Sequence, residues 1–298
     1  MRFRGLTRID HLRAAQIDGL EPRLRGDVWY ADSVNGNDNY SGKNWDVATA
    51  TIAAAYALCS AGDTIALFGS FSENVVCAKA GVTFIGMGTG YGQARWTGAA
   101  DTIALSITAA YVSVYNIRFS VPAYDSGLPS AIQLGSADYA KIIGNRFQGK
   151  AASWNAIYSP VANSDNVEII GNEFLYMNTV TYGCGILGVE ASGAGYSGWK
   201  IIKNTFHSCV IAVDILARGC TVYGNTIAEY GVAATGAIGA VLAMGIDLSG
   251  TDSGANMVWG NQLGGTYSAT LYVVGASGDQ WAGNYNVLTG GLTAANPS

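Results

Sequence analysis

The chain has 298 residues, 49% of them hydrophobic and only 12% charged, with 40 glycines and 5 prolines. This composition excludes a disordered chain and a collagen, and the apolar runs are too short and too broken to span a bilayer. The net charge is −5, but residues 1–27 hold six arginines against four acids. The acidity therefore lies in the rest of the chain, which should repel nucleic acid.

The five cysteines are scattered and odd in number, without a Cys-x-x-Cys pair. This pattern indicates buried thiols in a protein that folds in a reducing cytoplasm, without disulfides or a bound metal. The first residues also lack the apolar core of a secretory signal, so we expect neither export by that route nor a membrane partner. No phosphate-binding loop or other cofactor motif is recognisable, so no cofactor is expected.

Residues 1–27 form an arginine-rich arm, in which apolar residues from Leu6 to Leu20 recur near helical spacing. Two roles remain open for this short amphipathic helix. It could cap the exposed end of the following domain, or it could dock the protein on a larger assembly. In the second case the docking residues would be Arg2, Arg4, Arg8, Arg13, Arg23 and Arg25.

Residues 28–298 are predicted to form one domain, which begins with a cap region over residues 28–60. In this region a loop rich in Asn, Asp and Gly precedes a short helix, expected at about residues 48–59. The sequence Gly-Asp-Thr-Ile at 62–65 then starts a strand, and coils of strands are expected from about residue 61 to residue 290.

A repeated segment dominates these coils. Ile-Ile-Gly-Asn-Arg-Phe at 142–147 is followed by Ile-Ile-Gly-Asn-Glu-Phe at 169–174 and Ile-Ile-Lys-Asn-Thr-Phe at 201–206. The repeated asparagines are Asn145, Asn172, Asn204, Asn225, Asn261 and Asn284. They are separated by 21 to 36 residues, so the strand segments persist while the connections vary in length, which is typical of a solenoid.

Each repeat also contains a second β-rich segment, such as Ala-Ile-Gln-Leu at 131–134, so each turn of the solenoid has at least two strands. The asparagine is expected at a sharp corner, where it would take the left-handed backbone conformation. Its amide would bond to the amides of neighbouring coils. The glycine before it would permit the tight bend.

These segments resemble the right-handed parallel β-helix family, the pectate-lyase-like superfamily that includes bacteriophage tailspikes and other virion spikes. The resemblance covers about residues 28–290 and includes the cap region with its short helix. It implies an all-β fold, a single-stranded right-handed parallel β-helix. Because this fold carries lyases, hydrolases, adhesins and structural spikes alike, the resemblance is specific for the fold and leaves the function open.

Alternation within the repeat predicts which side chains point inward. The residues three positions before each asparagine and two positions after it are nearly all apolar, as at Ile142 and Phe147, and should stack as core columns. The position four before the asparagine should carry an outward charge ladder. The expected ladder consists of Lys141, Glu168 and Lys200, with a second pair at Arg146 and Glu173.

The position two before each asparagine is apolar as well, although alternation would turn it outward. Two interpretations remain open. Either the chain bends and buries both side chains, or the column is an apolar surface stripe, too large for a monomer to leave uncovered, that forms the seam of a homotrimer. The seam residues would be Ile143, Ile170, Ile202, Tyr223 and Trp259.

The best catalytic candidates are Asp214 and Asp247, which hold equivalent places in successive coils. Two outward carboxylates one coil apart would suit a glycoside hydrolase, because their repulsion would raise the pKa of one toward that of a general acid. Glu190 could lie on the coil before, and an acidic ladder without catalysis would give the same pattern. His207 has no carboxylate neighbour in the sequence that would make it a base.

Together with the resemblance, these features favour a non-enzymatic structural protein of a bacteriophage virion surface, a homotrimeric decoration protein or small spike. It would fold in the host cytoplasm, attach to capsid or tail proteins through its arm, and present its coil loops outward. Two alternatives remain open. One is a tailspike-like hydrolase or lyase that cleaves bacterial surface polysaccharide, and the other is an adhesin that binds such a glycan without cleaving it.

Overall fold

The structure, a computed structural model, describes residues 26–99, 102–122, 130–149, 153, 155–160, 164–177, 183–188, 196–209, 211–228, 244–248, 254–264, 272–273, 278–286 and 291–292. The six arginines of the predicted docking arm lie outside the described residues. None of the helices in the described part of the chain is long and apolar enough to cross a membrane.

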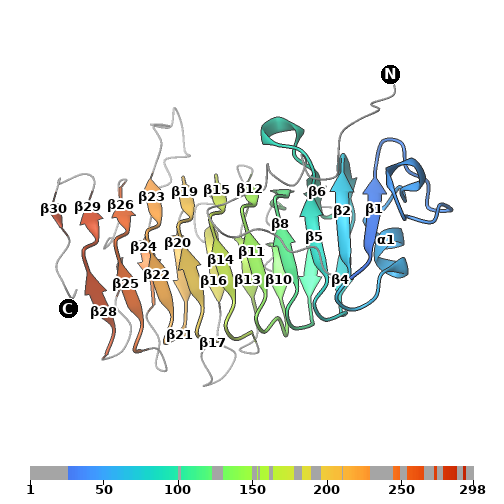
Figure 1. The fold of residues 1–298 in the computed structure, drawn as a ribbon. Helices are drawn as coiled ribbons and strands as arrows, with labels where there is room; N and C mark the ends of the chain where they lie inside the picture. The colour runs from blue at the N-terminus through green and yellow to red at the C-terminus, as the bar shows by residue number, and fades with distance from the viewer. Residues whose placement is uncertain are drawn as a thin grey trace.

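Three long sheets run along the molecule (Figure 1). Sheet A consists of β1 (Val28–Asp32), β2 (Thr64–Phe68), β5 (Thr83–Gly86), β8 (Ser113–Tyr115), β11 (Lys141–Ile143), β14 (Glu168–Ile170), β18 (Lys200–Ile202), β22 (Thr221–Tyr223), β25 (Met257–Trp259) and β28 (Gln280–Ala282). Sheet B consists of β3 (Ser70–Ser72), β6 (Arg95–Thr97), β9 (Arg118–Ser120), β12 (Arg146–Gln148), β15 (Glu173–Leu175), β19 (Thr205–His207), β23 (Thr226–Ala228), β26 (Gln262–Leu263), β29 (Tyr285–Asn286) and β30 (Gly291–Leu292). Sheet C consists of β4 (Val75–Cys77), β7 (Leu105–Ile107), β10 (Ser130–Leu134), β13 (Asn155–Ser159), β16 (Cys184–Gly188), β20 (Ile211–Ile215), β24 (Met244–Asp247) and β27 (Tyr272–Val273).

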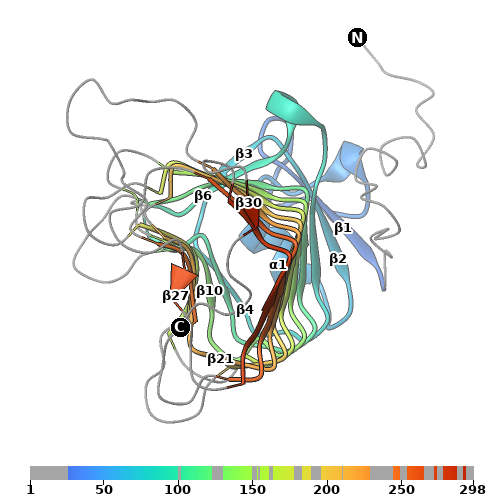
Figure 2. The same ribbon diagram turned by 90° about the vertical axis from the view of Figure 1, so that its left-hand side faces the viewer.

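Successive turns of one coil build these sheets, and each turn from β2 to β27 adds one strand to each of them. β11, β12 and β13 follow one another in the chain, yet each pairs in parallel with the strand one turn away. Figure 2, seen along the coil, shows the three sheets as the sides of one cross-section. A short parallel pair, β17 (Tyr196–Ser197) with β21 (Ala217–Arg218), and the antiparallel pair β29–β30 are added to this pattern. The repeat therefore forms the solenoid that its spacing predicts.

A tight corner joins each sheet A strand of the repeat to the next strand, in sheet B. The residue before the asparagine takes the left-handed conformation, with φ of 63° at Gly144 and 62° at Gly171. Lys203 occupies the same position with φ of 52°. The prediction that the asparagine itself is left-handed is therefore wrong. Glycine supplies the bend without a steric penalty, which leaves the asparagine free to turn its amide inward.

The asparagines of the repeat lie in one file inside this corner, each at most 2% exposed. Each of them except the last, Asn284, donates both its backbone N–H and its Nδ2 to the Oδ1 of the asparagine on the next coil, over 2.9–3.1 Å. The Nδ2 also reaches a backbone carbonyl on the preceding coil, as from Asn172 to Ile142 at 2.8 Å. Since buried amides are costly unless they are paired, this file fixes how the coils stack.

The file begins at an earlier variant of the repeat. There Asn116, with φ of 52°, takes the place that Gly144 takes one coil later, as the pairing of the flanking strands shows. Ile117 takes the place of the next asparagine, and its backbone N–H donates to the Oδ1 of Asn145 at 2.9 Å. The Oδ1 of Asn145, the first asparagine of the file, thereby has a backbone donor in place of an asparagine.

The core contains the columns that alternation predicts. The residues three before each asparagine are buried in sheet A, and the residues two after the first five asparagines are buried in sheet B. In sheet B the aromatic rings stack from coil to coil, with centroids 4.6–5.7 Å apart. The stack runs through Trp96, Phe119, Phe147, Phe174 and Phe206. Offset aromatic contacts of this kind add to the stabilisation from buried area.

The helix predicted in the cap region is shorter than expected. A 3-10 turn at Trp45–Val47 precedes α1 (Ile52–Leu58), and a second one lies at Gly90–Gly92. Thr51 caps α1 by accepting from the backbone N–H of Ala54, and Glu73 accepts from the N–H groups of Ile52 and Ala53 at 2.9 Å. These acceptors satisfy the first donors of the helix, so it starts there.

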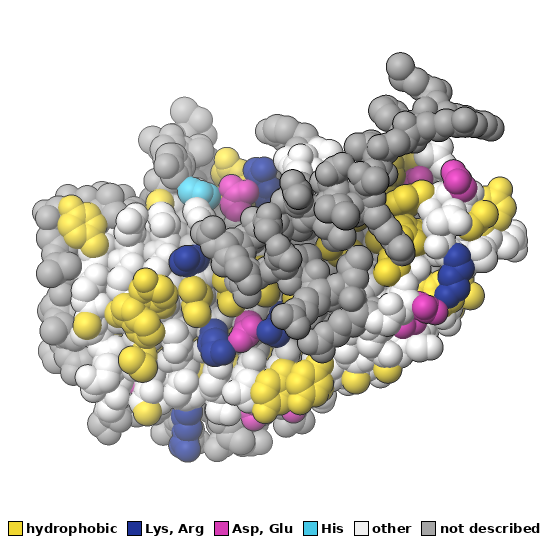
Figure 3. Space-filling model, viewed as in Figure 1, with side chains coloured by type: hydrophobic (Ala, Val, Ile, Leu, Met, Phe, Trp, Pro, Cys, Tyr) yellow, Lys and Arg dark blue, Asp and Glu magenta, His cyan; other side chains and the backbone are white. Residues whose placement is uncertain are grey.

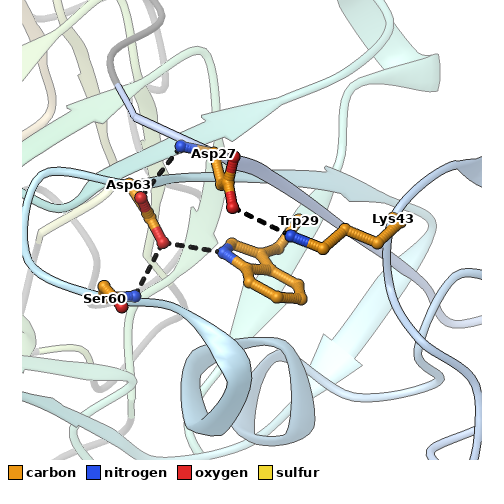
Figure 4. A network of polar contacts seen from close by, with 5 residues as sticks. All are labelled: Asp27, Trp29, Lys43, Ser60 and Asp63. Atoms are coloured by element: carbon orange, nitrogen blue, oxygen red, sulfur yellow. Dashed lines mark hydrogen bonds and ion pairs between the residues drawn. The ribbon is translucent and has the colours of Figure 1, made fainter.

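One buried carboxylate, that of Asp63, ties β1 to the start of β2 (Figure 4). It accepts hydrogen bonds from the backbone N–H of Asp27, the Nε1 of Trp29 and the backbone N–H of Ser60, over 2.7–2.9 Å. Burial alone would raise the pKa of Asp63, but these bonds hold it below its ordinary value. Lys43 completes the network by pairing with Asp27 at 2.9 Å and lying 3.6 Å from the centre of the Trp29 ring.

Candidate functional site

The outer face of sheet A carries the predicted seam column. Its residues pair from strand to strand. They do not belong to the hydrophobic core cluster, whereas the residue before each of them in the chain does. Ile143 and Ile170 are nevertheless only 3% and 9% exposed, whereas Ile202, Tyr223 and Trp259 are half-buried. The open part of the stripe therefore spans three coils rather than the expected five. Figure 3 shows apolar side chains gathered on this face.

The charge ladder lies on the same face. Glu168 Oε2 is 3.0 Å from the Nζ of Lys141, and its Oε1 is 2.9 Å from the Nζ of Lys200. Burial would raise the pKa of Glu168, but hydrogen bonds from both lysines hold it below its ordinary value. On sheet B, Arg146 Nε lies 3.2 Å from Glu173 Oε2. These contacts are the predicted charge ladder, in which opposite charges on paired strands favour the observed alignment of the coils.

Sheet C carries the candidate carboxylates. Asp214 on β20 pairs in register with Asp247 on β24, so the backbone places the two residues one coil apart. The side chain of Asp247 and all of Glu190 lie outside the described residues. The residue that pairs with Asp214 on the preceding coil is Leu187. The length of the connection between β16 and β20 does not determine how the two strands are aligned, so the sequence alone could not predict this pairing.

Sheet B carries a shallow depression that the sequence did not predict. It encloses about 290 Å³ and is lined by Arg146, Leu175, Tyr176, His207 and Ser208. Burial lowers the pKa of His207, while the negative charge of Glu173 acts in the opposite direction. The sequence around His207 contains no carboxylate, but the structure places the carboxylate of Glu173 near it from the adjacent coil.

The cysteines are free and buried, as their scatter predicts. Burial raises the pKa of Cys77 to about 11 and that of Cys209 to about 12, so both are protonated at neutral pH. Within the described residues no group of three or more His, Cys, Asp or Glu side chains could hold a metal ion.

A second polar file, at the corner between sheets C and A, also escaped the sequence analysis. The Oδ1 of Asn256 accepts from the backbone N–H of Cys220 at 2.9 Å. Asn256 in turn donates its N–H and its Nδ2 to the Oδ1 of Asp279, both at 3.0 Å. These three residues each lie five positions before an asparagine of the first file, which is the signal that could have found them.

No family model and no curated protein matches this sequence. Solved structures match the fold at low identity. A lacto-N-biosidase of family GH136 from Eubacterium ramulus is 13% identical with a TM-score of 0.51, covering 87% of this chain and 56% of that one. The Dettilon tailspike protein is 15% identical, with a TM-score of 0.42 and coverage of 80% and 50%. Pectate lyase Pel9A is 12% identical, with a TM-score of 0.42 and coverage of 87% and 79%.

The chain thus spans little more than half the length of the lacto-N-biosidase, and identities this low establish the fold alone. The likeness extends over most of the present chain. It agrees with the parallel pairing of strands one turn apart and with the asparagine file at the corner between sheets A and B. The chain is a right-handed parallel β-helix protein.

Proposed function

We propose that this protein is a non-enzymatic structural protein of a bacteriophage virion surface, a decoration protein or small spike, and that it assembles as a homotrimer. The observation that carries the proposal is the apolar column on the outer face of sheet A. Its open members, Ile202, Tyr223 and Trp259, are paired across adjacent strands and half-buried in the single chain.

This column has the chemistry of an interface. The rings of Tyr223 and Trp259 stack with their centroids 4.8 Å apart, and Met257 beside them is 51% exposed. Large aromatic side chains and methionine are enriched in the buried centres of protein interfaces, and water is a poor solvent for a contiguous apolar stripe. Three copies facing one axis would cover all three stripes at once, in a closed symmetric assembly.

The virion assignment is supported by the resemblance of the sequence to tailspike-type β-helices. In this proposal the arm at residues 1–27 attaches the trimer to capsid or tail proteins, and the loops between sheets face outward toward the bacterial surface. Backbone ladders and internal asparagine and aromatic files give a stiff rod, which suits a protein that projects from a particle.

The virion role is tested on purified particles of the phage that encodes the chain. We expect the full-length protein to co-purify with particles, and a variant that lacks residues 1–26 to remain trimeric but to be absent from them. Particles that contain no copies of the full-length chain would overturn the virion role. A truncated chain that unfolds or aggregates would instead show that the arm caps the β-helix.

The register of Asp214 with Asp247 favours one second candidate, a glycoside hydrolase that acts on bacterial surface polysaccharide. Parallel strands are about 4.8 Å apart, close to the separation of about 5 Å that retaining glycosidases use between their carboxyl groups. Release of oligosaccharide by the wild-type protein, lost in Asp214→Asn and kept in the control Asp46→Asn, would establish this function. Intact polysaccharide after incubation with the wild-type protein would contradict it.

A further inference from the structure

The outer face of sheet B is basic, although the chain as a whole is acidic. Arg95, Arg118 and Arg146 pair in register on three consecutive strands. The charged residues of the described sheet B strands are these three arginines and Glu173, whereas the whole chain has a net charge of −5. Two of these arginines have partners beside the column, because Arg95 donates from Nε to the Oγ of Ser120 at 3.0 Å and Arg146 pairs with Glu173 at 3.2 Å.

The column leads to the depression on the same sheet. Arg146 lines it from β12, Leu175 and Tyr176 line it from the end of β15, and His207 and Ser208 from the end of β19. Figure 3 shows this corner at the upper edge of the molecule, where the histidine lies beside acidic and basic side chains. The arginine column and the depression, together called the sheet B site, form one continuous surface.

Tyr176 gives this surface an exposed aromatic ring in an unfavourable backbone conformation. It is 41% exposed and has φ of 60°, and Ser208, one coil on, has φ of 52°. A bulky residue is rare in the left-handed region, and such strain is found most often at binding and catalytic sites. Both residues line the same depression, which places the exposed ring of Tyr176 beside Arg146.

These groups have the complementary chemistry of an acidic sugar. A guanidinium binds a carboxylate through two parallel hydrogen bonds, and a tyrosine ring offers an amphipathic face to the apolar side of a sugar ring. Glu173, 3.2 Å from Arg146, can only accept hydrogen bonds when ionised, which suits the hydroxyl groups of a sugar. Successive arginines lie about one strand spacing apart, so charges repeated along a chain could meet them in turn.

We propose that the sheet B site binds an acidic glycan. One sugar ring would lie on the ring of Tyr176, and the carboxylates of this sugar and of its neighbours would bind the arginine column. The site needs one chain only, so the proposal does not depend on the trimer or on the virion role. The same site also fits the adhesin function that the sequence left open.

A nucleic acid is the competing polyanion, and the structure favours the glycan. Glu173 would lie against the phosphates of a nucleic acid strand, and the acidic remainder of the chain repels a strand of such high charge density. An oligosaccharide has fewer charges and offers hydroxyl donors that the carboxylate of Glu173 can use.

The test uses the full-length protein and isothermal titration calorimetry with three probes. These are a mannuronate oligosaccharide, the neutral mannose oligosaccharide of equal length, and a single-stranded oligodeoxynucleotide. We expect measurable binding of the mannuronate oligosaccharide that weakens as salt is added, and at least tenfold weaker binding of the neutral one. Equal binding of the acidic and neutral sugars, no binding of the mannuronate oligosaccharide, or tighter binding of the oligodeoxynucleotide would overturn the proposal.

Matched variants locate the site. Arg146→Gln and Tyr176→Ala should each weaken mannuronate binding by about tenfold, the effect of losing one charge-assisted hydrogen bond or one aromatic contact. Lys141→Gln is the control for charge, because Lys141 also pairs with a glutamate, but on sheet A. Tyr139→Ala is the control for the ring, since Tyr139 is 45% exposed with φ of 58°. Controls that lose as much affinity as the test variants would place the ligand elsewhere.

Discussion

The Oδ1 of Asn204 accepts two hydrogen bonds from Asn172, one from the backbone N–H at 2.9 Å and one from Nδ2 at 3.0 Å. Asn204 repeats both donations toward Asn225 on the next coil, at 2.9 and 3.1 Å. Each amide within the file thus links the coil before it to the coil after it, and all of these amides are buried. The file stabilises the stacking of coils and makes a slip of one residue costly.

Replacing one member of the file should therefore destabilise the protein strongly. Asn204→Ala removes the acceptor of the buried backbone N–H of Asn172 and of one of its two Nδ2 hydrogens, while Nδ2 keeps its bond to the carbonyl of Ile142. We expect the free energy of unfolding to fall by about 2–4 kcal/mol. Urea denaturation followed by circular dichroism measures this change. Gln262→Ala, an exposed position next to Asn261, is the control and should change stability by less than about 0.5 kcal/mol. Equal effects of the two substitutions would show that the file has no special role.

The left-handed corner before the asparagine gives a second prediction. Lys203 holds φ of 52° at a position where Gly224 follows one coil later with φ of 63°. Lys203→Gly should raise the free energy of unfolding by roughly 0.5–1 kcal/mol, because glycine takes this conformation without a steric penalty.

The reverse substitution is the control. A Cβ added at Gly224 would meet only the Cγ of Lys203, at 3.7 Å, so space is not limiting there. Gly224→Ala should lower the free energy of unfolding by about 1 kcal/mol through backbone strain alone. If both variants change urea stability in the same direction, the left-handed corner does not control stability.

Part of this fold could be predicted from the sequence because its signals are local. The asparagine file and the core columns recur at fixed offsets within a short segment, so Asn145 or Phe147 could be placed without knowing the connections. The left-handed residue was assigned to the asparagine because both residues of a Gly-Asn pair tolerate that conformation. The hydrogen bonds between coils, which the sequence does not show, decide the assignment in favour of glycine.

The candidate sites were less predictable because they depend on register between coils of unequal length. Strand pairing places Leu187 opposite Asp214, which the spacing of the two segments in the sequence does not indicate. Arg95, Arg118 and Arg146 lie 23 and 28 residues apart in the sequence, without a constant period that would align them. Their column appears only when the strands are paired.

The ion pairs of Glu168 predict a pH dependence. Because hydrogen bonds from Lys200 and Lys141 hold its pKa below the ordinary value of 4.5, its carboxylate stabilises the folded state above about pH 4.5, and this stabilisation is lost as the pH falls through the folded pKa. Carbon-13 NMR of the glutamate carboxyl groups should show Glu168 titrating below 4.5. In Lys200→Gln the pKa should move up toward 4.5, and in Glu168→Gln the loss of stability in acid should be smaller. A wild-type pKa at or above 4.5 would contradict this reading of the ladder.

The mass of the protein in solution tests the proposed assembly most directly. Light scattering coupled to gel filtration should give three times the 31.0 kDa mass of the chain. Tyr223→Glu, which puts a charge into the open stripe, should give single chains, and the control Val76→Glu, at a 59% exposed position on sheet C, should leave the mass unchanged. A wild-type mass of 31.0 kDa at every protein concentration, or a trimer that survives Tyr223→Glu, would contradict the assignment of this face as the seam.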